Sequence, residues 1–253
     1  MEELAGVIAR GEALLAAGDP AQAIDVAERA LSIDPTSLAA LRLLASAQLE
    51  SGDAEAAHET VTGALQLDPD EVSLHLLNAS VLQALGRHRS AAHAGEAAIR
   101  CDPDLPEAYL AAALPLLALG RPEVYAAAGA HLETARRLAP EWAEVPLHQA
   151  SIALLRGDVA TGRDLAREAL SLEPENRDAQ LLLADIERHE QDAGRTADLL
   201  QAALALDPTD EAAQQRLDQL IRDALIGLAW MAFACAATVM VIIAIVTSDG
   251  AGA

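Results

Sequence analysis

The side chains best suited to chemistry in this 253-residue chain are seven histidines and two cysteines, and neither set has the spacing of a site. His189-Glu190 begins like the His-Glu-x-x-His helix of a zinc protease, but Ala193 stands where the second histidine is needed. Cys101 and Cys235 lie far apart, and Cys235 lies in an apolar run, which argues against a disulfide framework. Because every basic residue is arginine, no lysine can complete a phosphate-binding loop or form a Schiff base. The sequence therefore predicts no enzyme activity, no metal and no cofactor.

The chain is strongly acidic, with 39 Asp and Glu residues against 17 Arg and a net charge of −22. A surface of that sign repels the phosphates of nucleic acids, so nucleic acid is excluded as a predicted partner. Apolar residues make up 52% of the chain but aromatic residues only 2%, and 59 residues are alanine. Small apolar side chains with high helix propensity favour closely packed helices. We therefore expect an all-α fold.

A 34-residue repeat governs most of the chain. Prolines recur at intervals of 34, 34, 37, 34 and 34 residues, at Pro35, Pro69, Pro103, Pro140, Pro174 and Pro208. A glycine precedes each of the first five prolines, at Gly18, Gly52, Gly86, Gly120 and Gly157. The distance is 17 residues except from Gly120, where it is 20, so a three-residue insertion follows Gly120. Apolar residues at three- and four-residue steps, the turn glycine and the proline stop together predict a helix, a tight turn and a second helix in each unit.

This pattern resembles the tetratricopeptide repeat, a family built of stacked 34-residue helix pairs. The resemblance rests on the turn glycines, the prolines, an alanine five residues before each proline, and small residues within both helices, among them Ala45 and Ala57. It implies an all-α superhelical solenoid of about six helix-turn-helix repeats over residues 4–210. The expected units are 4–37, 38–71, 72–105, 106–142, 143–176 and 177–210. Residues 211–223 are expected to form a capping helix or linker, because the last repeat otherwise exposes an apolar face.

The fourth repeat departs from the pattern. It contains the insertion, Pro115 inside its first helix, and the aromatic residues Tyr109, Tyr125 and Trp142. An interior proline removes a backbone hydrogen bond and usually kinks the helix. Two interpretations stay open at this stage. Either the cluster is a functional irregularity, or Tyr109 fills a packing position and the other residues have drifted.

The C-terminal segment has a different composition. Residues 224–246 contain no charged residue, and a helix of that length would be about 35 Å long, enough to cross a bilayer core of about 30 Å. Arg216 and Arg222 precede the segment, whereas the short tail 247–253 has no basic residue. The positive-inside rule therefore predicts a single-pass transmembrane helix in the cell membrane, with cytoplasmic repeats and the C-terminus across the membrane. The alternative is a terminal helix buried against the solenoid. Small residues four apart in the segment also allow a weak homodimer.

The resemblance implies a concave groove lined by the first helix of each repeat. The predicted lining residues are Leu15, Arg42, Leu49, Leu76, Leu110, Leu117, Leu147, Leu154 and Leu181. The C-terminal half of the groove is fringed with acid, at Glu107, Glu144 and Asp178. The lysine and asparagine with which some family members hold a chaperone's C-terminal carboxylate are missing from these positions. We expect an amphipathic or extended protein segment with apolar anchors and basic flanks as the partner, although leucines that only pack between repeats would give the same pattern.

Three functions fit this organisation. The favoured one is a membrane-tethered, non-catalytic scaffold or adaptor that binds a partner segment in the groove. The others are a self-assembling structural component and an assembly or secretion chaperone at the membrane. The all-arginine, alanine-rich composition is typical of a GC-rich bacterial genome. The sequence identifies no particular partner.

Overall fold

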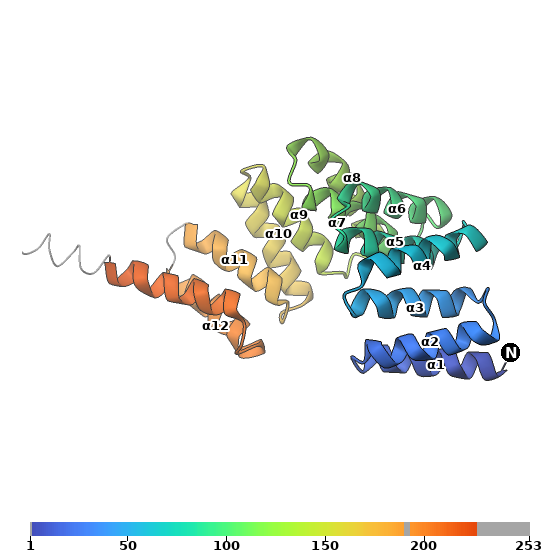
Figure 1. Cartoon of the computed structure of the whole chain (residues 1–253). Helices are drawn as coiled ribbons and strands as arrows, with labels where there is room; N and C mark the ends of the chain where they lie inside the picture. The colour runs from blue at the N-terminus through green and yellow to red at the C-terminus, as the bar shows by residue number, and fades with distance from the viewer. Residues whose placement is uncertain (1, 190–192, 227–253) are drawn as a thin grey trace, which may run out of the picture. The chain divides into compact units, whose positions relative to one another are not determined.

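The computed structural model describes residues 2–189 and 193–226, and every regular element within these residues is a helix (Figure 1). The chain forms two compact units, residues 1–165 and residues 166–253. Unit 1 contains α1 (Glu2–Ala16), α2 (Pro20–Ile33), α3 (Leu38–Glu50), α4 (Ala54–Leu67), α5 (Val72–Ala84), α6 (His88–Cys101), α7 (Pro106–Ala118), the 3-10 helix η1 (Pro122–Val124), α8 (Tyr125–Leu138) and α9 (Glu144–Leu155). The boundary between the units falls within α10 (Val159–Leu172). Unit 2 contains α11 (Arg177–His189), α12 (Ala193–Leu206) and helical residues 211–226.

Short sequence signals begin and end the helices, as the α3–α4 pair illustrates. Gly52 lies between the two helices with a φ of 88°, a conformation that glycine adopts without a steric penalty. The carboxylate of Asp53 then accepts a hydrogen bond from the N–H of Ala56 at 3.0 Å and caps the start of α4. At the other end Asp68 is extended, with φ −138° and ψ 99°, because Pro69 disfavours the helical conformation in the residue before it. The result is a helix pair with a fixed length.

The first helices of the pairs in unit 1 form a continuous row. Each helix from α1 to α9 packs against its neighbours in sequence, and Figure 1 shows the blue and green helices stacked in that order. In addition, α1 contacts α3, α3 contacts α5, α5 contacts α7, and α7 contacts α9. We call α1, α3, α5, α7 and α9 the odd-helix row. It is the part of the fold that positions the predicted binding residues of unit 1.

The core between the helices is built largely from alanine. Ala45, Ala64 and Ala98 are fully buried, as are many of their counterparts in other pairs. Small side chains let helix axes approach closely, so packing density replaces bulk. The closest approach lies between α6 and α7, where a Cβ atom on Gly95 would come within 2.4 Å of the backbone nitrogen of Ala112.

The irregular fourth pair is held by aromatic packing. The insertion forms η1 between α7 and α8, and α7 continues as one helix from residue 106 to residue 118 with the buried Pro115 inside it. Tyr125 is buried in the core cluster that joins α7, α8 and α9. Tyr109 and Trp142 pack against the same cluster. Of the two interpretations of these aromatic residues, the packing role is the one that the structure displays.

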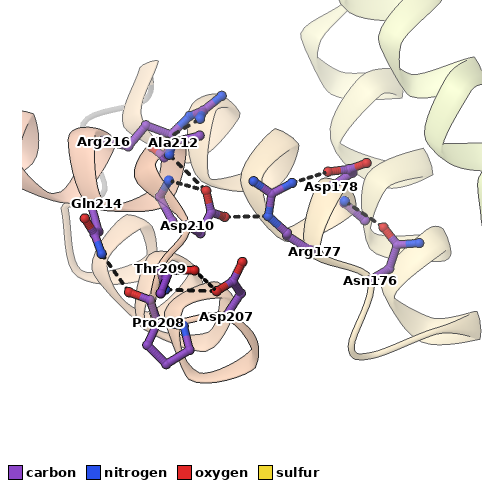
Figure 2. A network of polar contacts seen from close by, with 12 residues as sticks. Asn176, Arg177, Asp178, Asp207, Pro208, Thr209, Asp210, Ala212, Gln214 and Arg216 are labelled. Carbon is purple, nitrogen blue, oxygen red and sulfur yellow. Dashed lines mark hydrogen bonds and ion pairs between the residues drawn. The ribbon is translucent and has the colours of Figure 1, made fainter. Parts of the chain in front are cut away.

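In unit 2, the last described helix is fixed to α11 by two ion pairs. Arg177, at the start of α11, pairs with Asp210 (Figure 2). The carboxylate of Asp210 also accepts hydrogen bonds from the backbone N–H groups two and three residues later, at 2.9 and 3.1 Å, and so caps the helix over residues 211–226. One turn further on, Arg216 pairs with Asp185 of α11 at 3.0 Å. The residues expected to form a capping helix or linker are thus helical and bonded to α11.

Within residues 2–189 and 193–226, no helix combines the length and the apolar composition that crossing a bilayer requires. The predicted transmembrane helix at 224–246 lies outside the described residues except for its first three, which end the last helix. The tail 247–253 lies wholly outside them.

Candidate partner-binding face

The odd-helix row carries the predicted binding residues of unit 1, and their exposure divides them into two groups. Half-buried side chains, which offer apolar surface to a partner, are Leu15, Leu49, Leu76, Leu117 and Leu154. Leu110 and Leu147 are only 8% exposed, and Leu110 belongs to the aromatic core cluster. These two leucines contribute mainly to folding, because little of their surface is left for a partner.

Two predicted groove residues belong to unit 2. Leu181 of α11 is 7% exposed and lies in a core cluster with Leu200 of α12. Asp178, in the first turn of α11, is exposed and pairs with the neighbouring Arg177 at 3.2 Å. The first of these therefore packs the α11–α12 pair, whereas the second retains a solvent-accessible carboxylate.

The acidic residues of unit 1 are exposed and lie at helix N-termini. Glu107 is in the first turn of α7 and Glu144 is in the first turn of α9. The N-cap residues of these helices, Leu105 and Ala143, make no side-chain capping bond. A carboxylate in the first turn interacts favourably with the positive end of the helix dipole. The two glutamates thus have a local structural role and also project negative charge from the odd-helix row.

A hollow of 240 Å³ lies on the row between the starts of α3 and α5. It is lined by Leu38, Ala39, Arg42, Glu71, Ser73 and Leu74. Arg42 at its rim pairs with Glu12 of α1 at 2.8 Å, and both side chains are partly exposed. An exposed pair of this kind contributes about 1 kcal/mol or less, so a ligand can compete with it. Within the hollow, the hydroxyl of Ser73 donates to Glu71 at 2.7 Å.

Sequence reasoning identified Arg42 on this face but missed Glu12 and Glu71. Glu12 precedes Leu15 by three residues, so helical periodicity alone could have placed both on one side of α1. Glu71 is the N-cap residue of α5 and precedes the predicted first helix, where a groove position was not expected. Among the described residues, no three His, Cys, Asp or Glu side chains are arranged to hold a metal ion. What this face offers is contact surface with a defined charge.

Comparison with known proteins identifies the repeat. Two family profiles described as tetratricopeptide repeat match the sequence, one over residues 14–81 and the other over residues 147–211. The chain belongs to the tetratricopeptide-repeat family. The predicted all-α repeat fold is thereby confirmed. No curated protein matches the sequence.

Solved structures agree with the tetratricopeptide-repeat fold at low sequence identity. Cut9–Hcn1, a hetero-tetramer of the APC/C, is 16% identical with a TM-score of 0.73, and the match covers 86% of this chain but only 42% of that one. PilF of Pseudomonas aeruginosa is 20% identical with a TM-score of 0.70 and coverages of 86% and 98%. PilW, a type IV pilus biogenesis factor, is 19% identical with a TM-score of 0.73 and coverages of 86% and 99%. At this identity the likeness establishes the fold.

Proposed function

We propose that the chain is a non-catalytic protein-interaction scaffold that binds a partner segment along the odd-helix row of unit 1. The observation that supports this is the row itself, in which contacting helices present half-buried leucines, a 240 Å³ hollow and exposed carboxylates together. Tetratricopeptide repeats generally mediate protein–protein interaction. Apolar anchors of the partner would pack on leucines such as Leu76 and Leu117, and its basic flank would lie near Glu107 and Glu144.

Charge reversal on the row tests this proposal without disturbing the core. The variant Glu107→Arg with Glu144→Arg changes two exposed residues of α7 and α9. The matched control is Glu28→Arg with Glu59→Arg, which changes two exposed residues of α2 and α4, outside the row. Full-length proteins in mild detergent would be compared by affinity purification and quantitative mass spectrometry. We expect partner recovery to fall about tenfold in the row variant, from the loss of attraction at two charged contacts, and to stay unchanged in the control.

The same partners at the same recovery in both variants would show that the row is not the binding face. Circular dichroism at 222 nm confirms that helix content is kept. Leu110 and Leu147, although predicted groove residues, are unsuitable test positions, because charges placed at buried residues would report on folding.

We further propose that residues 224–246 hold this scaffold at the cell membrane, with the repeats in the cytoplasm and the C-terminus across the membrane. The support is the uncharged sequence of the segment and the large exposed side chains Ile221, Leu225 and Ile226 at the end of the last described helix. Apolar side chains in this position gain from contact with lipid at the membrane interface. Arg222 beside them suits the cytoplasmic side.

Fractionation tests the tether separately from the binding face. The full chain should stay in the membrane pellet after a carbonate wash, whereas a chain ending at residue 223 should be released. Protease added outside intact cells should leave the repeats uncut. Release of the full chain, or external cleavage of the repeats, would refute the tether and its orientation while leaving the binding proposal intact. Light scattering on the detergent-solubilised chain addresses the self-assembling alternative, which requires a dimer or larger species.

A further inference from the structure

A second hollow of 360 Å³ lies in unit 1, on the side of α9 away from the predicted groove. Arg136 of α8, Ile152 and Ala153 of α9, Arg156 at the end of α9, and Leu165 of α10 are among its lining residues. At 100° per residue, the α9 positions 149, 153 and 156 fall about half a turn around the helix from the groove positions 144, 147 and 154. The hollow is therefore a different surface from the odd-helix row. Its volume lies within the range of about 300 to 1,000 Å³ that is usual for ligand pockets.

A glycine keeps this hollow open. Gly129 of α8 lines it, and a Cβ atom at this residue would meet only the Cδ1 atom of Ile152, at 4.0 Å. The equivalent position in the first helix pair is Ile24, whose side chain is half-buried. Gly95, by contrast, is required by the backbone of the next helix. No such contact requires Gly129, and glycine weakens a helix interior relative to alanine, so the effect of this glycine is to leave the space empty.

The hollow has an apolar floor and a basic rim, in a chain whose net charge is −22. A guanidinium N–H of Arg136 donates to the Gln149 side-chain oxygen at 3.3 Å, which directs it along α9. The side chain of Arg156 makes no ion pair within the part of the chain that the structure describes. The one acidic lining residue, Asp158, accepts a hydrogen bond from the N–H of Thr161 at 3.1 Å and caps α10. Two guanidinium groups thus lie beside apolar surface, with a single carboxylate that is already bonded.

We propose that this hollow, which we call the α8–α9 pocket, binds a segment of a partner protein in which a carboxylate lies next to a branched apolar side chain. The apolar side chain fills the space above Ile152 and Ala153 left by Gly129, and the carboxylate lies between Arg136 and Arg156. Guanidinium groups match carboxylate geometry through paired N–H donors, so charge complementarity selects an acidic segment. This partner is opposite in charge to the one proposed for the odd-helix row, so the two faces would not compete for one segment.

Selection from a random dodecapeptide display library tests the pocket with a probe that samples all segment chemistries equally. The full-length chain in mild detergent is the target, with variants Gly129→Leu, which fills the space, and Arg156→Gln, which removes one rim charge. Gly63→Leu is the matched control, because Gly63 lies in α4 with nothing within 4 Å of its Cβ position. We expect selected peptides to place Asp or Glu next to Leu, Ile or Val. Their affinity should fall about tenfold or more in each pocket variant, stay unchanged in the control, and weaken with added salt.

Three results would overturn the proposal: no enriched peptides, enriched peptides without an acidic residue, or acidic peptides that bind both pocket variants as well as the wild type. The last result would place the acidic peptides on another surface. Arg156→Gln alters only an exposed side chain, so the test holds even if Gly129→Leu perturbs folding. The odd-helix row variant Glu107→Arg with Glu144→Arg should bind the same peptides as the wild type, which separates this pocket from the proposed scaffold face.

Discussion

Replacing Gly95 by alanine should destabilise unit 1, because α6 and α7 meet at this residue with no room for a methyl group. A Cβ atom there would lie 2.4 Å from the backbone nitrogen of Ala112 and 2.5 Å from the carbonyl carbon of Ala111. Ordinary van der Waals contact begins at 3.4 Å, so the two helices have to separate by about 1 Å. A gap of that size forfeits a quarter to a half of the attraction between the atoms facing it.

The expected magnitude follows from two opposing effects. Overpacking a core costs about 1 to 3 kcal/mol, and the upper end applies here because the obstructing atoms are backbone and cannot change rotamer. Alanine is about 1 kcal/mol more favourable than glycine inside a helix. The free energy of unfolding should therefore fall by about 2 kcal/mol in Gly95→Ala. In the matched control Gly63→Ala nothing lies within 4 Å of the new methyl group, so only the helix propensity acts and stability should rise by about 1 kcal/mol.

Urea unfolding of the full chain, followed by circular dichroism at 222 nm, measures both variants. With a slope of about 2 kcal/mol per molar urea, the midpoint should fall by about 1 M for Gly95→Ala and rise by about 0.5 M for Gly63→Ala. Opposite signs for the same substitution are the essential result. If Gly95→Ala is as stable as the wild type, the close approach of α6 and α7 does not restrict residue 95, and the reasoning fails.

Two further predictions concern the cap of unit 2 and the core. The hydrogen bond from Arg177 lowers the pKa of Asp210 from 3.8 to about 2, so the stabilisation from this carboxylate is present above pH 3.8 and is lost as the pH falls towards 2. The difference in thermal midpoint between the wild type and Asp210→Asn should therefore shrink over that window, whereas a constant difference would contradict the assignment. Leu132→Ala, which empties a fully buried site, should lower the free energy of unfolding by about 2 to 5 kcal/mol. Leu155→Ala, at a 58% exposed site, should change it by about 0.5 kcal/mol or less, as urea unfolding would show.

The helix pairs could be predicted from the sequence because their boundaries are set by local effects. A glycine with positive φ, an aspartate cap and a proline stop each act on the residues next to them, as Gly52, Asp53 and Pro69 show. Repeating these signals every 34 residues repeats the pair. The insertion was also visible, since it changes one interval from 34 to 37. Its conversion into η1 was not, because a three-residue turn has no periodicity of its own.

The exposure of individual side chains could not be predicted, because it depends on how closely other helices approach. Gly63, Gly95 and Gly129 all lie inside second helices, yet one faces open space, one touches the next backbone and one opens a hollow. Leu110 and Leu117 share the predicted face of α7, but the aromatic cluster buries the first and leaves the second half-buried. The sequence therefore predicted which face of each helix could carry a partner, whereas the division between core and contact surface required tertiary structure.

The same stretch of unit 1 that breaks the repeat also replaces its local stabilisation. Helices α2 to α5 each begin with a side-chain cap, but α6 to α9 begin with none, and each cap contributes about 1 kcal/mol. Around α7 to α9, buried Tyr125, Leu132 and Val145 form a cluster against which Trp142 packs. Helices in proteins draw most of their stability from such packing, so the cluster can hold helices that lack caps and follow an insertion. Gly129 lies within this stretch, which places the α8–α9 pocket on the least repetitive part of the chain. A regular repeat offers similar surfaces along its length, and the departure from regularity is what gives one of them a distinct shape and charge.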